Sequence, residues 1–327
     1  MSFTITEPHH QVLASVAVEP AVAGEEPPGQ DAPANEPRES RRGRGKDPDN
    51  AATVQAQYPF GARLIGHLVL LAVSFISVFP IYWLFATAFR REGDVGENTL
   101  FPWPISLENF ATVFDSIPVF SMVGNTFLMS LAVAAGQLIL ATLAAYGFAM
   151  WEFPGKNVLF LVFLGSWLVP FQVTMMPNYV ALSNMGLLDT VLGVILPSLA
   201  SAFAVMLMRQ HMTAFPRELI DAAHMDGRNH WGILLRVVLP NMRPALAALG
   251  IMLFIEAWNN YLWPTLVMRN EPNALLQMGL RAFMGGDQGT NWGATVAAAG
   301  IACIPIFLIY LFLQRYIVDA FVRSGLR

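Results

Sequence analysis

The side chains best suited to specific chemistry are concentrated in one polar stretch, residues 216–240, that separates two strongly apolar stretches. In order, its notable residues are Pro216, Glu218, Asp221, Ala222, Ala223, Asp226, Gly227, Leu239 and Pro240. Carboxylates here could pair with Lys or Arg on another protein, and alanines would let that surface approach closely. This combination of residues favours protein docking over catalysis.

The same stretch predicts two short helices. Pro216 and Glu218 suit the first turn of a helix, where proline loses no hydrogen bond and a carboxylate meets the positive end of the dipole. Gly227 fits the left-handed position that ends a helix. A second amphipathic helix follows over 231–238 and closes at Leu239-Pro240. Two readings stay open: the first helix docks a cytoplasmic protein, or it lies on the chain's own bundle.

Motifs for enzymatic chemistry are missing. A phosphate-binding loop needs G-x-x-x-x-G-K-[ST], and both Gly45-Lys46-Asp47 and Gly155-Lys156-Asn157 lack the final hydroxyl residue and the upstream glycine. None of the six histidines has metal-ligand spacing, and the single cysteine, Cys303, cannot form an intrachain disulfide. We therefore expect no enzyme, no metal site and no cofactor on this chain.

Composition indicates an all-α membrane protein. Of 327 residues, 55% are hydrophobic and only 13% are charged, whereas soluble domains are about a quarter charged. A helix needs about 20 apolar residues to cross the hydrocarbon core. Six such spans are predicted near 64–89, 119–148, 158–178, 190–208, 246–268 and 292–314.

Residues 1–58 have a different character. They contain scattered prolines and the basic run 38–46, and such a segment buries too little apolar surface to offset the entropy of ordering. We expect a disordered cytoplasmic N-terminal tail at 1–58, with a six-span domain at 59–327. The apolar patch at 12–18 has no basic residue before it, so it does not resemble a signal peptide.

Basic residues predict the orientation. Of the nineteen Lys and Arg residues, only Arg90, Arg91, Arg269 and Arg281 fall on one side of the predicted spans; the remaining fifteen fall on the other. Cytoplasmic loops carry the excess of Lys and Arg. Both termini and the loop at 209–245 are therefore expected in the cytoplasm.

Polar residues inside the fifth predicted span form a second candidate site. A carboxylate in a bilayer is costly and is expected to face protein or water. The candidates for a solute path are Glu256, Asn259, Asn260, Tyr261 and Trp263, of which Glu256, Asn259, Asn260 and Trp263 would share a helical face most nearly. Aromatic faces and amides suit a polyhydroxylated ligand. The alternative is a polar clamp between helices. Asn125, Gln137 and Asn178 are weaker candidates.

The polar stretch resembles the EAA motif of permease subunits of binding-protein-dependent ATP-binding-cassette (ABC) importers. That motif reads E-A-A-x-x-x-G, nine residues, then I-x-L-P. Here Asp221 replaces the usual Glu, Ala222, Ala223 and Gly227 match, and Val237 replaces Ile before Leu239-Pro240. The blocks at 258–264 (WNNYLWP) and 314–318 (QRYIV) are similar to those of carbohydrate permeases of the maltose and glycerol-phosphate type.

The resemblance implies a six-helix transmembrane permease domain of the type I ABC importer (MetI-like) fold, with a coupling loop at 209–245. It implies that ATPase contact involves Glu218, Asp221, Ala222, Ala223, Asp226, Gly227, Leu239 and Pro240. It also implies a bacterial inner-membrane assembly with a second permease, two ATPase copies carrying ATP and Mg, and an extracytoplasmic solute-binding protein, and no nucleic acid. The solute class would be a sugar or sugar-like molecule. A stand-alone secondary transporter or channel and a membrane scaffold remain alternatives.

Overall fold

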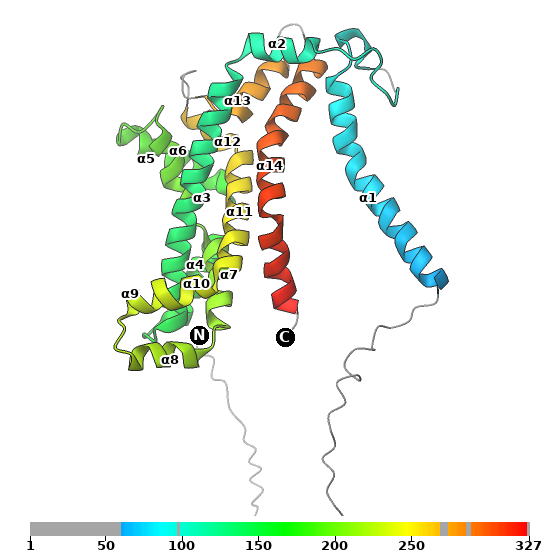
Figure 1. Cartoon of the computed structure of the whole chain (residues 1–327). Helices are drawn as coiled ribbons and strands as arrows, with labels where there is room; N and C mark the ends of the chain where they lie inside the picture. Colours follow the sequence, from blue (N-terminus) through cyan, green and yellow to red (C-terminus); the bar gives the residue numbers. More distant parts are fainter. Residues whose placement is uncertain (1–59, 97–98, 269–273, 286–288, 326–327) are drawn as a thin grey trace, which may run out of the picture. The chain divides into compact units, whose positions relative to one another are not determined.

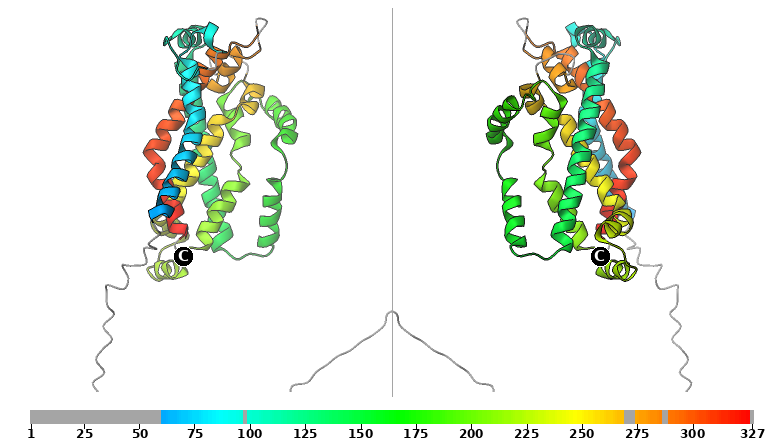
Figure 2. Two further views of the ribbon diagram at one scale, coloured as in Figure 1. Left: turned by 90° about the vertical axis from the view of Figure 1, so that its right-hand side faces the viewer. Right: turned by 90° about the vertical axis from the view of Figure 1, so that its left-hand side faces the viewer.

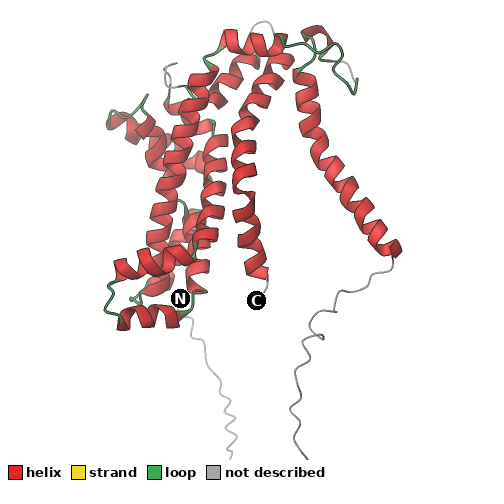
Figure 3. Ribbon diagram, viewed as in Figure 1, coloured by secondary structure: helices red, strands yellow, loops and turns green. Residues whose placement is uncertain are grey.

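The structure, a computed structural model, describes residues 60–96, 99–268, 274–285 and 289–325 (Figures 1 and 3). The chain divides into two units, Met1–Ala62 and Arg63–Arg327, and the description below concerns the second. The tail predicted at 1–58 lies outside the described residues. Every regular element in the described part is a helix, which agrees with the expected all-α class.

Three of the described helices are long and apolar enough to cross a bilayer: α1 (Phe60–Ala88), α3 (Val119–Met150) and α14 (Trp292–Gly325). They correspond to the predicted first, second and sixth spans. Both α1 and α14 contain an internal proline, Pro80 and Pro305. Prolines are tolerated in membrane helices because neighbouring groups satisfy the freed backbone carbonyls.

Two of the remaining predicted spans are broken. Helix α4 (Lys156–Ser166) meets α5 (Phe171–Asn184) at 91°, and α6 (Val191–Ser198) meets α7 (Ala202–Thr213) at 49°. Pro170 sits at the start of α5 in an extended conformation, which a continuing helix cannot accommodate. The hydroxyl of Ser201 accepts a hydrogen bond from the Ala204 N–H at 3.2 Å and begins α7 as a new helix.

The fifth predicted span differs most from the structure. Helix α11 (Arg243–Asn259) ends where Asn260 adopts an extended backbone, and α12 (Leu262–Val267) follows as a separate helix. The expectation that Trp263 shares a helical face with Glu256 and Asn259 is therefore wrong, because the helix stops before Trp263. A further bend of 81° at Met242 separates 230–241 from α11. If each of the three bent pairs is one span, the described chain has up to six.

Helix α3 is the centre of the bundle and packs against α7 and α11 (Figure 1). Alanines make these contacts close: Ala141, Ala145 and Ala204 are almost fully buried. Small residues at helix crossings let backbones approach in membranes, where packing drives association. Two polar contacts join more distant elements to α3. The Gln137 amide donates to the Ser198 carbonyl oxygen at 2.6 Å, and the Leu276 N–H donates to the Thr126 hydroxyl at 2.8 Å.

Short helices cover the two ends of the bundle. One end carries η2 (Glu92–Asp94), α2 (Glu108–Ser116), α13 (Leu276–Leu280) and η5 (Arg281–Phe283). Buried Asn109 fastens this end, since its amide donates to the carbonyl oxygens of Ala88 and Arg90 at 3.1 and 2.7 Å. The opposite end carries α8 (Arg217–Met225), α9 (His230–Ile233), the π-helical turn η3 (Leu234–Val238) and α10 (Leu239–Asn241) (Figure 1).

Candidate functional site

The polar stretch folds into a helical hairpin, residues Arg217–Asn241, called here the α8–α10 hairpin. Helix α8 follows Pro216 and carries Glu218 in its first turn, as the sequence predicts. Gly227 has φ of 73° and ends the helix. The N–H groups of Gly227 and Arg228 donate to the carbonyl oxygens of His224 and Ala223 at 2.9 and 3.1 Å. These two bonds make a Schellman motif, which satisfies the last carbonyls of α8.

The second arm of the hairpin starts with a side-chain cap. The Asn229 side-chain oxygen accepts a hydrogen bond from the Gly232 N–H at 2.8 Å. One continuous helix was predicted over 231–238, and the structure divides the arm into α9 and the π-helical turn η3. A π-turn inserts one extra residue and re-aims the side chains that follow. Leu239 and Pro240 come next, half-buried, directly before the bend into α11.

The inner face of the hairpin is built into the core of the bundle. Ile220 and Ala223 from α8 join Ile233, Leu234 and Val238 from the second arm, and all five are buried in one hydrophobic cluster. The same cluster contains residues of α3, α7 and α11. The hairpin is therefore packed rigidly on helices of the bundle and is not a loose connection.

The outer face of the hairpin is exposed and partly apolar. Met225 is 89% exposed and Trp231 61%, and Ala222 is exposed beside them. Leu235 and Leu219 are exposed as well. A shallow hollow of about 480 Å³ lies between Gly227, Trp231 and Leu235. The two alternatives, packing on the bundle and docking of a partner, thus apply to different faces of α8. Ala223 packs on the bundle, and Ala222 is open to a partner.

The predicted carboxylates of the hairpin have no basic partner within the described chain. Glu218, Asp221 and Asp226 are exposed, and none of them takes part in an ion pair among the residues the structure describes. Three carboxylates and a small apolar patch on one rigid hairpin are suited to a surface that carries Arg or Lys.

A cavity of about 880 Å³ lies inside the bundle. Its lining residues come from α4 and α5 and from α3, α6, α7 and α11. In Figure 2 the ribbons of α4 and α5 stand apart from those of the other four helices. Its polar lining residues are Gln137, Ser166, Thr174, Asn178, Ser198, Ser201, Glu256, Asn259 and Asn260. The broken spans produce this lining, since each break places polar side chains at helix ends within the bundle.

The structure separates the predicted path residues into two groups. Glu256, Asn259 and Asn260 line the cavity, as do the weaker candidates Gln137 and Asn178. Trp263 is fully buried behind the wall, and its indole N–H donates to the Gly193 carbonyl oxygen at 3.3 Å. Tyr261 is 43% exposed and does not line the cavity. Asn125 is bonded to the Ala274 carbonyl oxygen at 3.4 Å, away from the cavity.

Aromatic side chains at the cavity were not among the predicted path residues. Trp167, Phe171 and Phe203 line it, with the Trp167 and Phe203 rings 5.6 Å apart. Trp167 and Phe171 lie on either side of the α4–α5 break at Pro170, and Phe203 lies at the start of α7. The only sequence signal was an aromatic residue on each side of that proline, which indicates a bend but not the direction in which the rings point.

Comparison with known proteins decides the family. Residues 137–323 match the family described as "Binding-protein-dependent transport system inner membrane component", and this range includes the whole hairpin and most of the cavity wall. The chain belongs to that family. The resemblance to ABC importer permeases is thereby confirmed, and a stand-alone transporter or channel is disfavoured.

Individual relatives of this permease agree with the family match. The arabinooligosaccharides transport system permease protein AraQ of Halalkalibacterium halodurans is 31% identical over 260 residues, which cover 78% of this chain and 93% of the relative. The sn-glycerol-3-phosphate transport system permease protein UgpE of Salmonella choleraesuis is 31% identical over 273 residues, covering 81% and 97%.

A solved structure supports the permease fold. A chain from a bacterial ABC transporter involved in the import of the acidic polysaccharide alginate superposes with a TM-score of 0.68 at 24% sequence identity. The match covers 80% of this permease and 99% of that chain. The multi-pass architecture expected for an inner-membrane subunit follows from the family and from the apolar helices.

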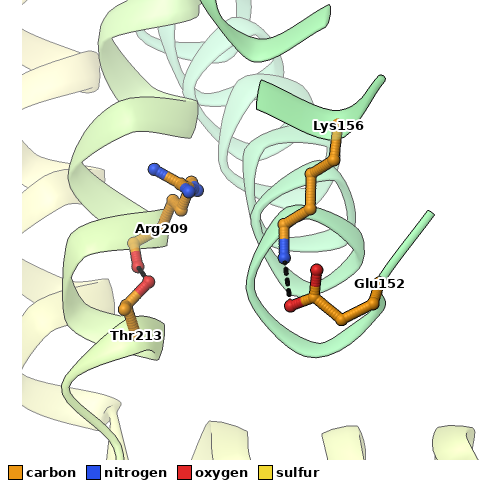
Figure 4. A network of polar contacts seen from close by, with 4 residues as sticks. All are labelled: Glu152, Lys156, Arg209 and Thr213. Carbon is orange, nitrogen blue, oxygen red and sulfur yellow. Dashed lines mark hydrogen bonds and ion pairs between the residues drawn. The ribbon is translucent and has the colours of Figure 1, made fainter. Parts of the chain in front are cut away.

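Arg209, one of the basic residues of the predicted 209–245 loop, packs between two helices of the bundle. Arg209 lies on α7, partly buried, with its guanidinium 4.1 Å from the centre of the Phe160 ring on α4. Its carbonyl oxygen accepts from the Thr213 hydroxyl at 2.8 Å (Figure 4). Arg209 thus joins α7 to α4, since a cation over an aromatic face is attractive.

The nearby pair of Glu152 and Lys156 connects the end of α3 to α4, with 2.9 Å between Nζ and Oε1 (Figure 4). The hydrogen bond from Lys156 and its positive charge hold the pKa of the Glu152 carboxyl below its usual value. The carboxyl is open to solvent, so the pair adds little to stability.

Proposed function

We propose that this permease forms one half of the path of an ATP-driven importer for a sugar or sugar-like solute, and that the α8–α10 hairpin receives the ATPase. One observation carries the proposal: a single hydrophobic core contains the inner face of the hairpin and helix α11, which lines the cavity. A rigid displacement of the hairpin would therefore move the cavity wall. Alternation between two packings is a general mode of such transitions.

In this proposal the ATPase contacts the outer face of the hairpin. Asp221, Asp226 and Glu218 pair with its basic residues, and Ala222 and Gly227 keep the approach close. Leu239 and Pro240 set the angle at which the second arm returns to α11. ATP and Mg belong to two copies of the partner ATPase, so this permease is not itself an enzyme and carries no cofactor or metal.

The remaining partners in this proposal are the lipid bilayer, a second permease and an extracytoplasmic binding protein. The apolar side chains of α1 are exposed along most of its length, Phe75 and Ile76 by 72% and 70%. Such a surface fits the lipid bilayer together with a second permease. An extracytoplasmic binding protein delivers the solute at the end that carries α2 and α13. The hairpin and both termini are in the cytoplasm, and no nucleic acid is involved.

The sugar class rests on the relatives and on the cavity. The relatives are named for arabinooligosaccharides and for glycerol phosphate. Aromatic rings can stack on the C–H faces of sugar rings, while amides and hydroxyls bond their hydroxyl groups. The cavity contains both, since its lining includes the rings of Trp167 and Phe203 and the side-chain amides of Asn259 and Asn260.

Reconstitution in proteoliposomes tests the proposed function. The complete assembly of both permeases, the ATPase and the binding protein is expected to accumulate solute only with ATP and Mg. Accumulation by this chain alone without ATP would contradict the proposal.

A further inference from the structure

The residues that line the cavity differ in charge, and this charge can discriminate between charged and uncharged solutes of similar shape. Among the described residues that line it, Glu256 is the only ionisable one, and no Lys, Arg or His is present. Glu256 is exposed and is part of the cavity lining. A cleft with one sign of charge and low-dielectric walls concentrates ions of the opposite sign and repels those of its own.

The hydroxyl groups of the lining add to this bias. A hydroxyl has one proton, and those of Ser166, Thr174 and Ser198 donate to carbonyl oxygens of their own helices at 2.6, 2.9 and 3.0 Å. These three hydroxyls therefore offer only oxygen lone pairs to a solute. The Asn259 amide donates one N–H to the Ile255 carbonyl oxygen at 2.9 Å, which leaves its side-chain oxygen and one N–H for a solute.

The carboxylate of Glu256 and the three acceptor hydroxyls suit a solute that brings its own donors. Sugar hydroxyls and ammonium groups donate hydrogen bonds, whereas phosphate and carboxylate groups only accept them at neutral pH. An anionic solute would face the Glu256 carboxylate, and the described lining has no Lys, Arg or His to pair with its charge. Burial of an unpaired charge is unfavourable.

We infer that Glu256 sets the charge selectivity of the path, which admits uncharged or amino-bearing polyhydroxylated solutes and rejects anionic ones such as phosphate esters and uronates. This inference rests on the proposed function, because it concerns the same cavity. Glu256 acts as a specificity-determining residue through its charge.

Single-cysteine chemistry measures the charge directly. The chain has one natural cysteine, Cys303, so a Cys303→Ser background with Asn259→Cys places one thiol a helical turn from Glu256. The complete assembly in membrane vesicles is treated with two methanethiosulfonates of similar size, one bearing trimethylammonium and the other sulfonate. We expect the cationic reagent to be favoured, and Glu256→Gln to lower the ratio of the two rates by about tenfold. Glu256→Asp keeps the charge and is expected to retain the ratio.

A matched control locates the effect in the cavity. Phe101 is 74% exposed in the segment between η2 and α2 and does not line the cavity, so the ratio at Phe101→Cys should not respond to Glu256→Gln. Reaction at Asn259→Cys with an unchanged ratio would overturn the charge inference and leave the path intact. No reaction of that cysteine with either reagent would contradict the proposed path itself.

Discussion

The indole N–H of Trp263 donates to the backbone carbonyl oxygen of Gly193 at 3.3 Å, and this bond joins α12 to α6. Both residues are tightly packed. Trp263 is fully buried, and a Cβ on Gly193 would lie 2.3 Å from the Leu187 carbonyl oxygen. The bond between Trp263 and Gly193 thus stabilises the packing of α12 on α6 next to the cavity. Trp263, predicted to contact solute, instead has a structural role.

Trp263→Phe is expected to lower stability by about 1 kcal/mol, because it removes one hydrogen bond and keeps most of the ring. Trp263→Ala should cost about 3–5 kcal/mol through the cavity that it leaves. Thermal unfolding of the purified permease in detergent measures both. Trp231 is 61% exposed on the hairpin, so Trp231→Phe serves as the control and should leave the unfolding temperature unchanged. An equal shift in both phenylalanine variants would contradict the supporting role of Trp263.

Ala222 and Ala223 are adjacent and should respond in opposite ways. Ala223 is 5% exposed in the core, so Ala223→Leu overfills it and should destabilise the permease by about 1–3 kcal/mol. Ala222 is exposed, and Ala222→Leu should leave the unfolding temperature unchanged. Its bulk should weaken ATPase binding by roughly tenfold, equivalent to about 1.4 kcal/mol. Co-purification of the ATPase together with thermal unfolding distinguishes the two effects. Normal ATPase binding by Ala222→Leu would argue against docking on this face.

Substitutions at Gly227 test whether ATPase binding depends on the turn that ends α8. A Cβ at this position would meet no atom within 4 Å, so substitution acts only through the positive φ and the N–H bond to His224. Gly227→Pro fixes φ near −65° and removes the donor, and it should abolish transport and ATPase recruitment while membrane insertion stays intact. Gly227→Asn is the matched control, because Asn tolerates the left-handed conformation, and it should retain both activities. Normal ATPase association in the proline variant would contradict the docking role.

Asn260 and Tyr261 are adjacent in the sequence but differ in their relation to the cavity. Asn260 lines the cavity and Tyr261 does not. Asn260→Ala should reduce solute transport by about fivefold, the value of one hydrogen bond of about 1 kcal/mol, without changing assembly. Tyr261→Phe should transport normally. Initial uptake rates in vesicles that contain the complete assembly measure both, and an unaltered rate for Asn260→Ala would assign that residue to packing.

Local signals in the sequence identified the hairpin well. Pro216 begins α8, and Gly227 ends it at φ of 73°, because the helix-start preference of proline and the conformational freedom of glycine are properties of the residues themselves. The length of their apolar stretches predicted α1, α3 and α14, because that length is likewise a property of the local sequence. These features depend little on what lies across the bundle.

Features that depend on tertiary packing could not be read from the sequence. The break at Asn260 is a single extended residue, and neither Trp263 nor Tyr261, both predicted to line the path, lines the cavity. Apolarity alone did not indicate the bend at Pro170, where residues on both sides line the cavity, or the bend at Met242, which separates the hairpin from α11. Likewise, Ala222 and Ala223 look equivalent in sequence, and only the packing of α8 decides which one is exposed.

Photo-crosslinking from the outer face of α8 shows whether this face binds a separate ATPase. A photoreactive phenylalanine derivative is placed at Ala222 in cells that express the partner subunits, and captured peptides are identified by mass spectrometry. We expect capture of an ABC ATPase from position 222, whereas the same probe at the buried neighbour Ile220 should crosslink only within the chain. Crosslinks from position 222 to the chain's own helices or to lipid alone would rule out docking on this face.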